Sequence, residues 1–250
     1  MNSSEDHSLS QTETIAPPAR KRIAPAWHTV VLIAVLLFFS LASAGSQAEY
    51  VDQHGRMSIY LMTMGWEWLL TLYVVWGLRI MRVPLRDIVG GRWNDPFDAL
   101  IDMAIAAGFW LLSAMVLAGM AYALGLAKEQ NIEAARHQIS FLFPHSGVEI
   151  VVWALLSATA GFCEEIIFRG YLQTQLSRMT GATWIGILGQ AAVFGGSHAY
   201  EGWQRVIIIA VWGSMFGVLA MFRRSLRPGM MAHAFHDFFT GVAGRVLLGG

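Results

Sequence analysis

The chain has 250 residues, of which 55% are hydrophobic and only 14% charged, and its formal net charge is zero. Soluble domains usually carry about 25% charged residues, and the apolar residues here form long blocks, so the composition indicates a membrane protein. A net charge of zero gives no reason to expect nucleic acid as a partner. The single cysteine, Cys163, excludes an intrachain disulfide and a metal site built from several cysteines.

The first 26 residues differ in composition from the rest. Residues 1–26 are polar, contain consecutive prolines and end in a basic cluster, which predicts a disordered cytoplasmic tail. Residues 27–250 predict an all-α, polytopic membrane helical bundle with about seven transmembrane helices. The first apolar block also resembles a signal peptide, but the long tail before it favours a retained helix. The predicted spans are 27–45, 57–79, 99–126, 147–170, 182–200, 203–222 and 229–248.

The distribution of basic residues predicts the orientation. With the N-terminus in the cytoplasm, 12 of the 17 Lys and Arg residues fall on the cytoplasmic side. This bias follows the positive-inside rule and predicts a multi-pass protein of the inner (plasma) membrane. The basic loop 80–98 is interpreted as an orientation determinant that touches lipid headgroups, with a gate or substrate-docking surface as the alternative.

A pair of glutamates interrupts the apolar span 147–170. A carboxylate in hydrocarbon is costly, so it needs a partner or a function. Glu165 and Arg169 are four residues apart with the acid first, the favourable order for an ion pair on a helix. Glu164 is rotated about 100° from Glu165 and is free to face another helix. The sequence therefore predicts Glu164 as the working carboxylate and Glu165–Arg169 as its support, although a purely structural ion pair is the alternative for Glu165 and Arg169.

Two histidine sites follow in later spans. Glu164 and His198 are equally distant from the turn at Gly181, so both lie about 25 Å from it on an antiparallel hairpin. His233 and Asp237 share one face of the last span, and His236 is the other candidate there. For His233 to meet Glu164, the hairpin must project beyond the membrane by roughly 16 Å, or the loop before His233 must dip inward.

These groups suit hydrolysis by activated water. Glutamate with histidine can take a proton from water, and a second histidine can donate to the oxyanion that forms on an amide carbonyl. Alternatively, Glu164, His198 and His233 could bind zinc and leave its fourth position for water. No Gly-x-Ser-x-Gly motif is present, which argues against a serine mechanism. We favour a reaction that needs no cofactor.

Three motifs together resemble the CPBP intramembrane protease family, which includes type II CAAX prenyl proteases and bacteriocin-processing and self-immunity proteins. They are Glu164-Glu165-x-x-x-Arg169, Phe194-x-x-x-His198 and His233-x-x-x-Asp237, within about residues 147–241. The resemblance implies an intramembrane endopeptidase in which Glu164 and His198 activate water and His233 with residue 237 stabilises the oxyanion. It implies peptide or protein substrates in or at the bilayer, and a site that opens toward the cytoplasm.

Some features leave alternatives open. Position 237 is often Asn in the family, and an ionised Asp237 would repel an oxyanion. It stays protonated, orients His233 or contributes to a metal site, and we favour the first two. Glu67 lines the substrate cavity or bonds to a neighbouring helix, and the role of Asp102 is open. The competing function is a non-catalytic membrane protein, an immunity factor or transporter, that uses the charged cluster for binding or proton relay.

Overall fold

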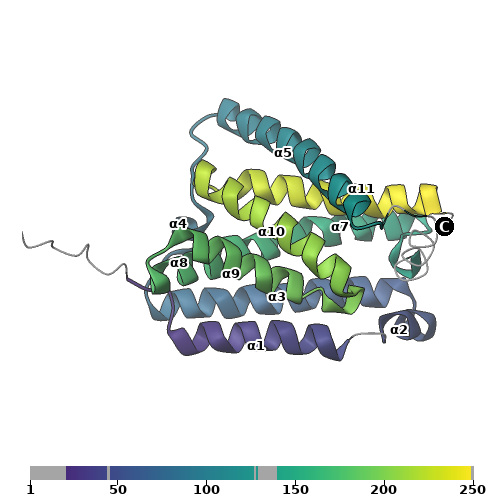
Figure 1. Cartoon of the computed structure of the whole chain (residues 1–250), viewed down its shortest axis with the longest axis horizontal. Coiled ribbons are helices and arrows are strands. Elements are labelled where there is room, and N and C mark those ends of the chain that lie inside the picture. Colours follow the sequence, from purple (N-terminus) through teal and green to yellow (C-terminus); the bar gives the residue numbers. More distant parts are fainter. Residues whose placement is uncertain (1–20, 44–45, 127, 129–139, 249–250) are drawn as a thin grey trace, which may run out of the picture.

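The computed structural model describes residues 21–43, 46–126, 128 and 140–248, and within these ranges the chain is helical with no β-strand. Figure 1 shows long helices that run side by side in alternating directions. The elements are α1 (Ala26–Ala42), α2 (Gln47–His54), α3 (Arg56–Ile80), α4 (Leu85–Val89), α5 (Pro96–Ala123), the 3₁₀ turn η1 (Ser140–Leu142), α7 (Gly147–Glu164), the π-helix η2 (Glu165–Gln173), α8 (Thr174–Thr180), α9 (Thr183–Gly196), the 3₁₀ turn η3 (Ala199–Glu201), α10 (Trp203–Arg223) and α11 (Arg227–Leu248).

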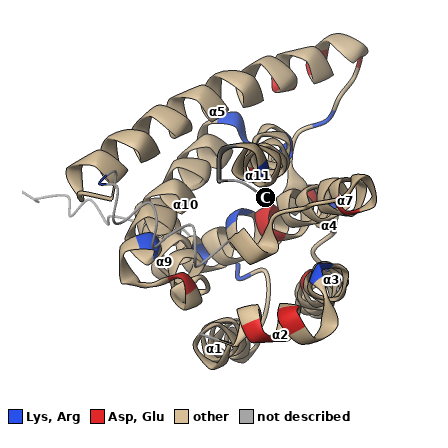
Figure 2. Cartoon of the chain, turned by 90° about the vertical axis from the view of Figure 1, so that its right-hand side faces the viewer, with Lys and Arg blue, Asp and Glu red and all other residues tan. Residues whose placement is uncertain are grey.

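Helix α7 lies between α3 and α11. It packs against both, and α9 packs against α10. In the end-on view of Figure 2, α5 crosses one side of the bundle while α1 and α3 lie on the other. The main apolar core lies between these layers and surrounds the π-helix η2, in which all nine residues are buried.

The basic segments share one end of the bundle, the end that Figure 1 places on the left. Val89 accepts a backbone hydrogen bond from Leu226, and Gly90 pairs with Ser225, so the loop after α3 contacts the turn after α10. The Arg178 guanidinium donates to the carbonyl of Lys21, which joins α8 to the segment before α1. These are the segments that the sequence assigns to the cytoplasm. Their position at one end of the bundle agrees with spans that run in alternating directions. That this end faces the cytoplasm stays a prediction.

The last residues of the predicted tail are packed. Residues 1–20 lie outside the described residues, but Ile23 and Ala24 are completely buried. The Gln175 side chain accepts from both of their N–H groups and donates to the Ala24 carbonyl. The side-chain amide thus pairs the buried backbone groups of the segment that leads into α1. Residues 21–25 therefore belong to the folded domain, although the sequence placed them in the tail.

The predicted number of spans is only partly supported. In the described part of the chain, three helices are long and apolar enough to cross a membrane, Pro96–Ala123, Gly147–Thr180 and Trp203–Arg223. The bent pair of α1 and α2 would add a fourth. Helices stand at all seven predicted positions, but α1 has 17 residues and α9 has 14, fewer than the roughly 20 that span hydrocarbon. Seven spans are therefore not confirmed.

Candidate active site

The acidic pair lies where an α-helix becomes a π-helix. A capping box starts α7, because the Ser146 hydroxyl accepts from the Glu149 N–H and the Glu149 carboxylate accepts from the Ser146 N–H. The apolar run continues to Glu164, and from Glu165 the backbone follows the π-helix η2. Such segments are rare and frequently mark functional sites. Here the wider turn begins between the two adjacent glutamates.

The predicted ion pair between Glu165 and Arg169 is present. Nη1 of Arg169 lies 2.8 Å from Oε1 of Glu165, and both side chains are buried. The guanidinium also lies 4.3 Å from the ring centre of Phe194 and 4.9 Å from that of Phe216. The aromatic faces and the carboxylate together compensate the loss of hydration of the cation.

His233 contacts both glutamates. Its Nδ1 lies 3.1 Å from Oε1 of Glu165, and its Nε2 lies 3.5 Å from Oε2 of Glu164. The same Nε2 is 3.6 Å from Oδ2 of Asp237. The sequence assigned Glu165 to Arg169 alone, whereas the structure has Glu165 contact both Arg169 and His233. Adjacent helical side chains diverge, but one imidazole offers two nitrogens on opposite edges and so reaches both.

Gly161 allows this contact. A Cβ atom at this position would lie 2.7 Å from the carbonyl oxygen of Met230 and 2.7 Å from the backbone nitrogen of Ala234. The glycine lets the backbones of α7 and α11 touch one turn before the glutamates, as small residues do between membrane helices. His233 lies on α11 between these two contact points and thus faces Glu164 and Glu165.

The helical hairpin extends beyond the α10–α11 turn. Gly170 lies against the side chains of Ile88 and Leu226, and the latter belongs to that turn. The ten residues after Gly170, up to Thr180, continue the same helix by about 15 Å. Gly181 then ends α8 in the left-handed conformation, with φ of 76°. Both arrangements that the sequence left open, a hairpin that projects beyond the membrane and a loop that dips inward, require this extension past the α10–α11 turn.

His198 lies in the turn after α9, two residues beyond the last helical residue, Gly196. Its Nδ1 is 2.8 Å from the Phe194 carbonyl and 3.3 Å from the Ser197 hydroxyl. The sequence paired it with Glu164. Among the described residues, however, the two side chains make no hydrogen bond or ion pair, while His198 lies close enough to Asp237 to interact with it electrostatically. The early end of α9 explains the difference.

Sequence reasoning missed two members of this neighbourhood and left a third open. Tyr200 and Glu201 lie close enough to Asp237 to interact with it electrostatically. Glu67 on α3 is buried and interacts with Glu164 and Asp237. The signal for Tyr200 and Glu201 was their position directly after His198. Glu67 was noted as an intramembrane acid, and the structure places it beside the cluster.

The comparison with protein families gives one match. Residues 146–239 match the family described as Rce1-like, type II CAAX prenyl endopeptidase Rce1-like. Over this segment, the chain is similar to the CPBP family of type II CAAX prenyl endopeptidases. Comparison with curated proteins and with solved structures found no match. The matched segment nearly coincides with the predicted region 147–241, and together with the apolar helices it identifies a multi-pass membrane protein with a CAAX protease-type peptidase domain.

The remaining polar residues of the CPBP domain and its surroundings have separate partners. Asp102 accepts from Nε of Arg223 at 2.9 Å and from the Trp93 indole at 2.8 Å, so it joins α5 to the end of α10. The His236 ring lies 4.6 Å from that of Trp212. Among the described residues, no three His, Cys, Asp or Glu side chains are placed to hold a metal ion, and Glu164, His198 and His233 do not form such a group.

Proposed function

We propose that the chain is an intramembrane endopeptidase that hydrolyses peptide bonds of substrates in or at the bilayer with water activated by Glu164. The observation that carries the proposal is the different exposure of the two glutamates around His233. The Glu164 side chain is 18% exposed and that of Glu165 is 1% exposed. Only the former is open to a water molecule, and the latter is bound to Arg169 and His233.

His198 is the proposed second base. A backbone carbonyl only accepts hydrogen bonds, so the contact with Phe194 places the proton of a neutral imidazole on Nδ1. This leaves the lone pair of Nε2 free to accept a proton. Whichever of Glu164 and His198 takes the proton of the attacking water then gives that proton to the departing amine, so the peptide bond is hydrolysed without a covalent intermediate.

His233 is the proposed oxyanion donor. With Nδ1 held by Glu165, its Nε2 faces the space between Glu164 and Asp237, and as an imidazolium it donates a second N–H to the oxyanion. Asp237 lies 3.6 Å from that nitrogen, too far for a hydrogen bond but close enough to orient the ring. The reaction as proposed needs no cofactor. Zinc held by Glu164, His198 and His233 is the alternative.

The test compares the native membrane proteome of cells that carry the wild-type chain with that of cells that carry Glu164→Gln. We expect cleavage products in the wild type that disappear in the variant while both chains accumulate equally. Glu49→Gln, on α2, is the control and should leave the products unchanged. Turnover of a verified substrate by Glu164→Gln would reject the catalytic assignment and favour the non-catalytic alternative.

A further inference from the structure

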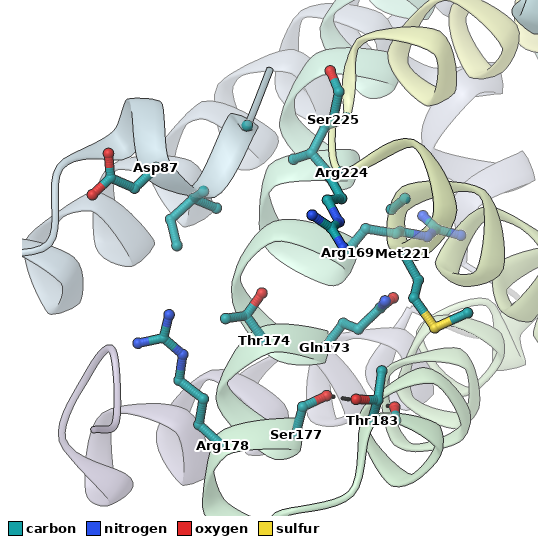
Figure 3. Close-up of a pocket in the computed structure, with 14 residues that line it drawn as sticks. Asp87, Arg169, Gln173, Thr174, Ser177, Arg178, Thr183, Met221, Arg224 and Ser225 are labelled. Carbon is teal, nitrogen blue, oxygen red and sulfur yellow. Dashed lines mark hydrogen bonds between the residues drawn. The ribbon is translucent and has the colours of Figure 1, made fainter. Parts of the chain in front are cut away.

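A polar cleft of about 330 Å³ opens at the basic end of the bundle. It lies between α4, α8 and the turn that joins α10 to α11 (Figure 3). Its lining reaches Arg169, whose charge is paired with that of Glu165. Its lining includes Arg169, Arg178 and Arg224 but a single carboxylate, that of Asp87. Asp87 is largely exposed, faces Arg86 at 3.7 Å and points away from the arginines in Figure 3. The cleft is therefore rich in positive charge.

Two of the arginines have no acidic partner. Within the described ranges, the guanidinium of Arg224 makes no hydrogen bond or ion pair, and that of Arg178 donates only to the Lys21 carbonyl. Thr174 lies between them in Figure 3. Guanidinium groups that lack a counter-charge, next to a hydroxyl, form an array of hydrogen-bond donors that suits an anion with several oxygens.

The inner wall also holds unsatisfied polar atoms. Gln173 and Arg169 both line the cleft and are at least nine-tenths buried. Each donates one hydrogen bond to α10, to Gly217 and Gly213 respectively. Nε of Arg169 and Oε1 of Gln173 are buried with no partner among the described residues. Buried polar groups without partners are uncommon and usually bind water, and of these two atoms only Nε of Arg169 can donate to an anion.

The backbone at Arg224 adds a separate argument. Arg224 ends α10 in the left-handed conformation, with φ of 54° and ψ of 32°. Glycine is the usual residue at such a position because a Cβ atom is unfavourable there. The arginine is thus not the residue that the backbone favours, and its side chain is directed into the cleft in Figure 3.

We propose that this cleft binds a phosphate group. Guanidinium groups match the geometry of phosphate oxygens, and the hydroxyl of Thr174 supplies a further donor. The cleft lies at the end of the bundle where the basic segments gather, which is where lipid headgroups meet a membrane protein. The phosphate comes from the headgroup of an anionic phospholipid or from a soluble phosphate, and the same contacts serve both.

The test measures lipid binding to the purified full chain by native mass spectrometry, with phosphatidylglycerol and phosphatidylcholine as probes. We expect the wild type to prefer phosphatidylglycerol. Arg224→Gln and Arg178→Gln should each weaken that binding about tenfold, the loss typical of one charge-assisted hydrogen bond. Arg79→Gln removes an exposed charge from the same end of the bundle without touching the cleft, and should change binding less than twofold.

A second variant separates binding from folding. Arg224→Gly should keep or raise the melting temperature, because glycine relieves the left-handed backbone, yet lose binding as Arg224→Gln does. Displacement of phosphatidylglycerol by millimolar glycerol phosphate would support one site that binds both kinds of phosphate. Binding of glycerol phosphate without any preference for phosphatidylglycerol would assign the site to a soluble phosphate. Equal losses in all three Gln variants, or no binding of either probe, would overturn the proposal.

Discussion

Nδ1 of His233 lies 3.1 Å from Oε1 of Glu165, the same oxygen that accepts the hydrogen bond from Arg169. One carboxylate oxygen thus accepts from both Arg169 and His233, while Oε2 of the same side chain is buried with no hydrogen-bond partner in the described part of the chain. The position of the imidazole therefore depends on an ion pair within the neighbouring helix. Glu165 therefore contributes both to the stability of the fold and to the position of His233.

The first prediction concerns that pair. Glu165→Gln should lower the free energy of unfolding by about 3–5 kcal/mol, because it leaves the buried Arg169 without its counter-charge. The double variant Glu165→Leu with Arg169→Met should be closer to the wild type, since apolar residues of similar size replace a buried pair well. Thermal unfolding in detergent measures both. A wild-type melting temperature for Glu165→Gln would show that the pair contributes little.

The second prediction concerns the contact of α7 with α11. Gly161→Ala should reduce proteolysis at least tenfold, because the added methyl group meets the backbone of α11 and moves His233 away from Glu164. Gly65→Ala is the control, since nothing lies within 4 Å of a Cβ there. Cleavage of a verified substrate by detergent-solubilised protein is the measurement. Equal activity of the two variants would contradict this role for Gly161.

The third prediction concerns orientation. In a Cys163→Ser background, a cysteine at Asn94 in the basic loop should resist a membrane-impermeant thiol reagent in intact cells. A cysteine at Gln53 on α2, at the opposite end of the bundle, should react. Both positions are exposed, so lysis should make the first reactive as well. The reverse labelling pattern would place the N-terminus outside the cytoplasm.

The fourth prediction concerns zinc. Purified, active protein should contain far less than one zinc per chain by elemental analysis and should keep its activity after prolonged chelation. Glutamate with histidine as base and histidine as donor supply the chemistry without an ion. Loss of activity on removal of stoichiometric zinc, with recovery when zinc returns, would establish the metal-dependent alternative instead.

The sequence predicted the local features well. The helices follow from apolar runs, and the Glu165–Arg169 pair follows from its spacing, because both depend on residues a turn apart. The contact of both glutamates with His233 could not be derived, because it depends on how closely α7 and α11 approach each other. The end of α9 before His198 was also missed, because helix boundaries depend on capping and packing as well as on apolar content. Likewise, nothing in the apolar pattern indicated the π-helix.

The hydrogen bonds between Gln175 and the segment before α1 affect the order in which the chain assembles. The N–H groups of Ile23 and Ala24 bind a side chain 152 and 151 residues further along. At about 5–20 residues per second, the ribosome needs roughly 8–30 s to make that partner. During this interval the N–H groups of Ile23 and Ala24 donate to other acceptors, such as water or lipid headgroups at the membrane surface. The first helix to be synthesised therefore cannot make all its final contacts until α8 has emerged.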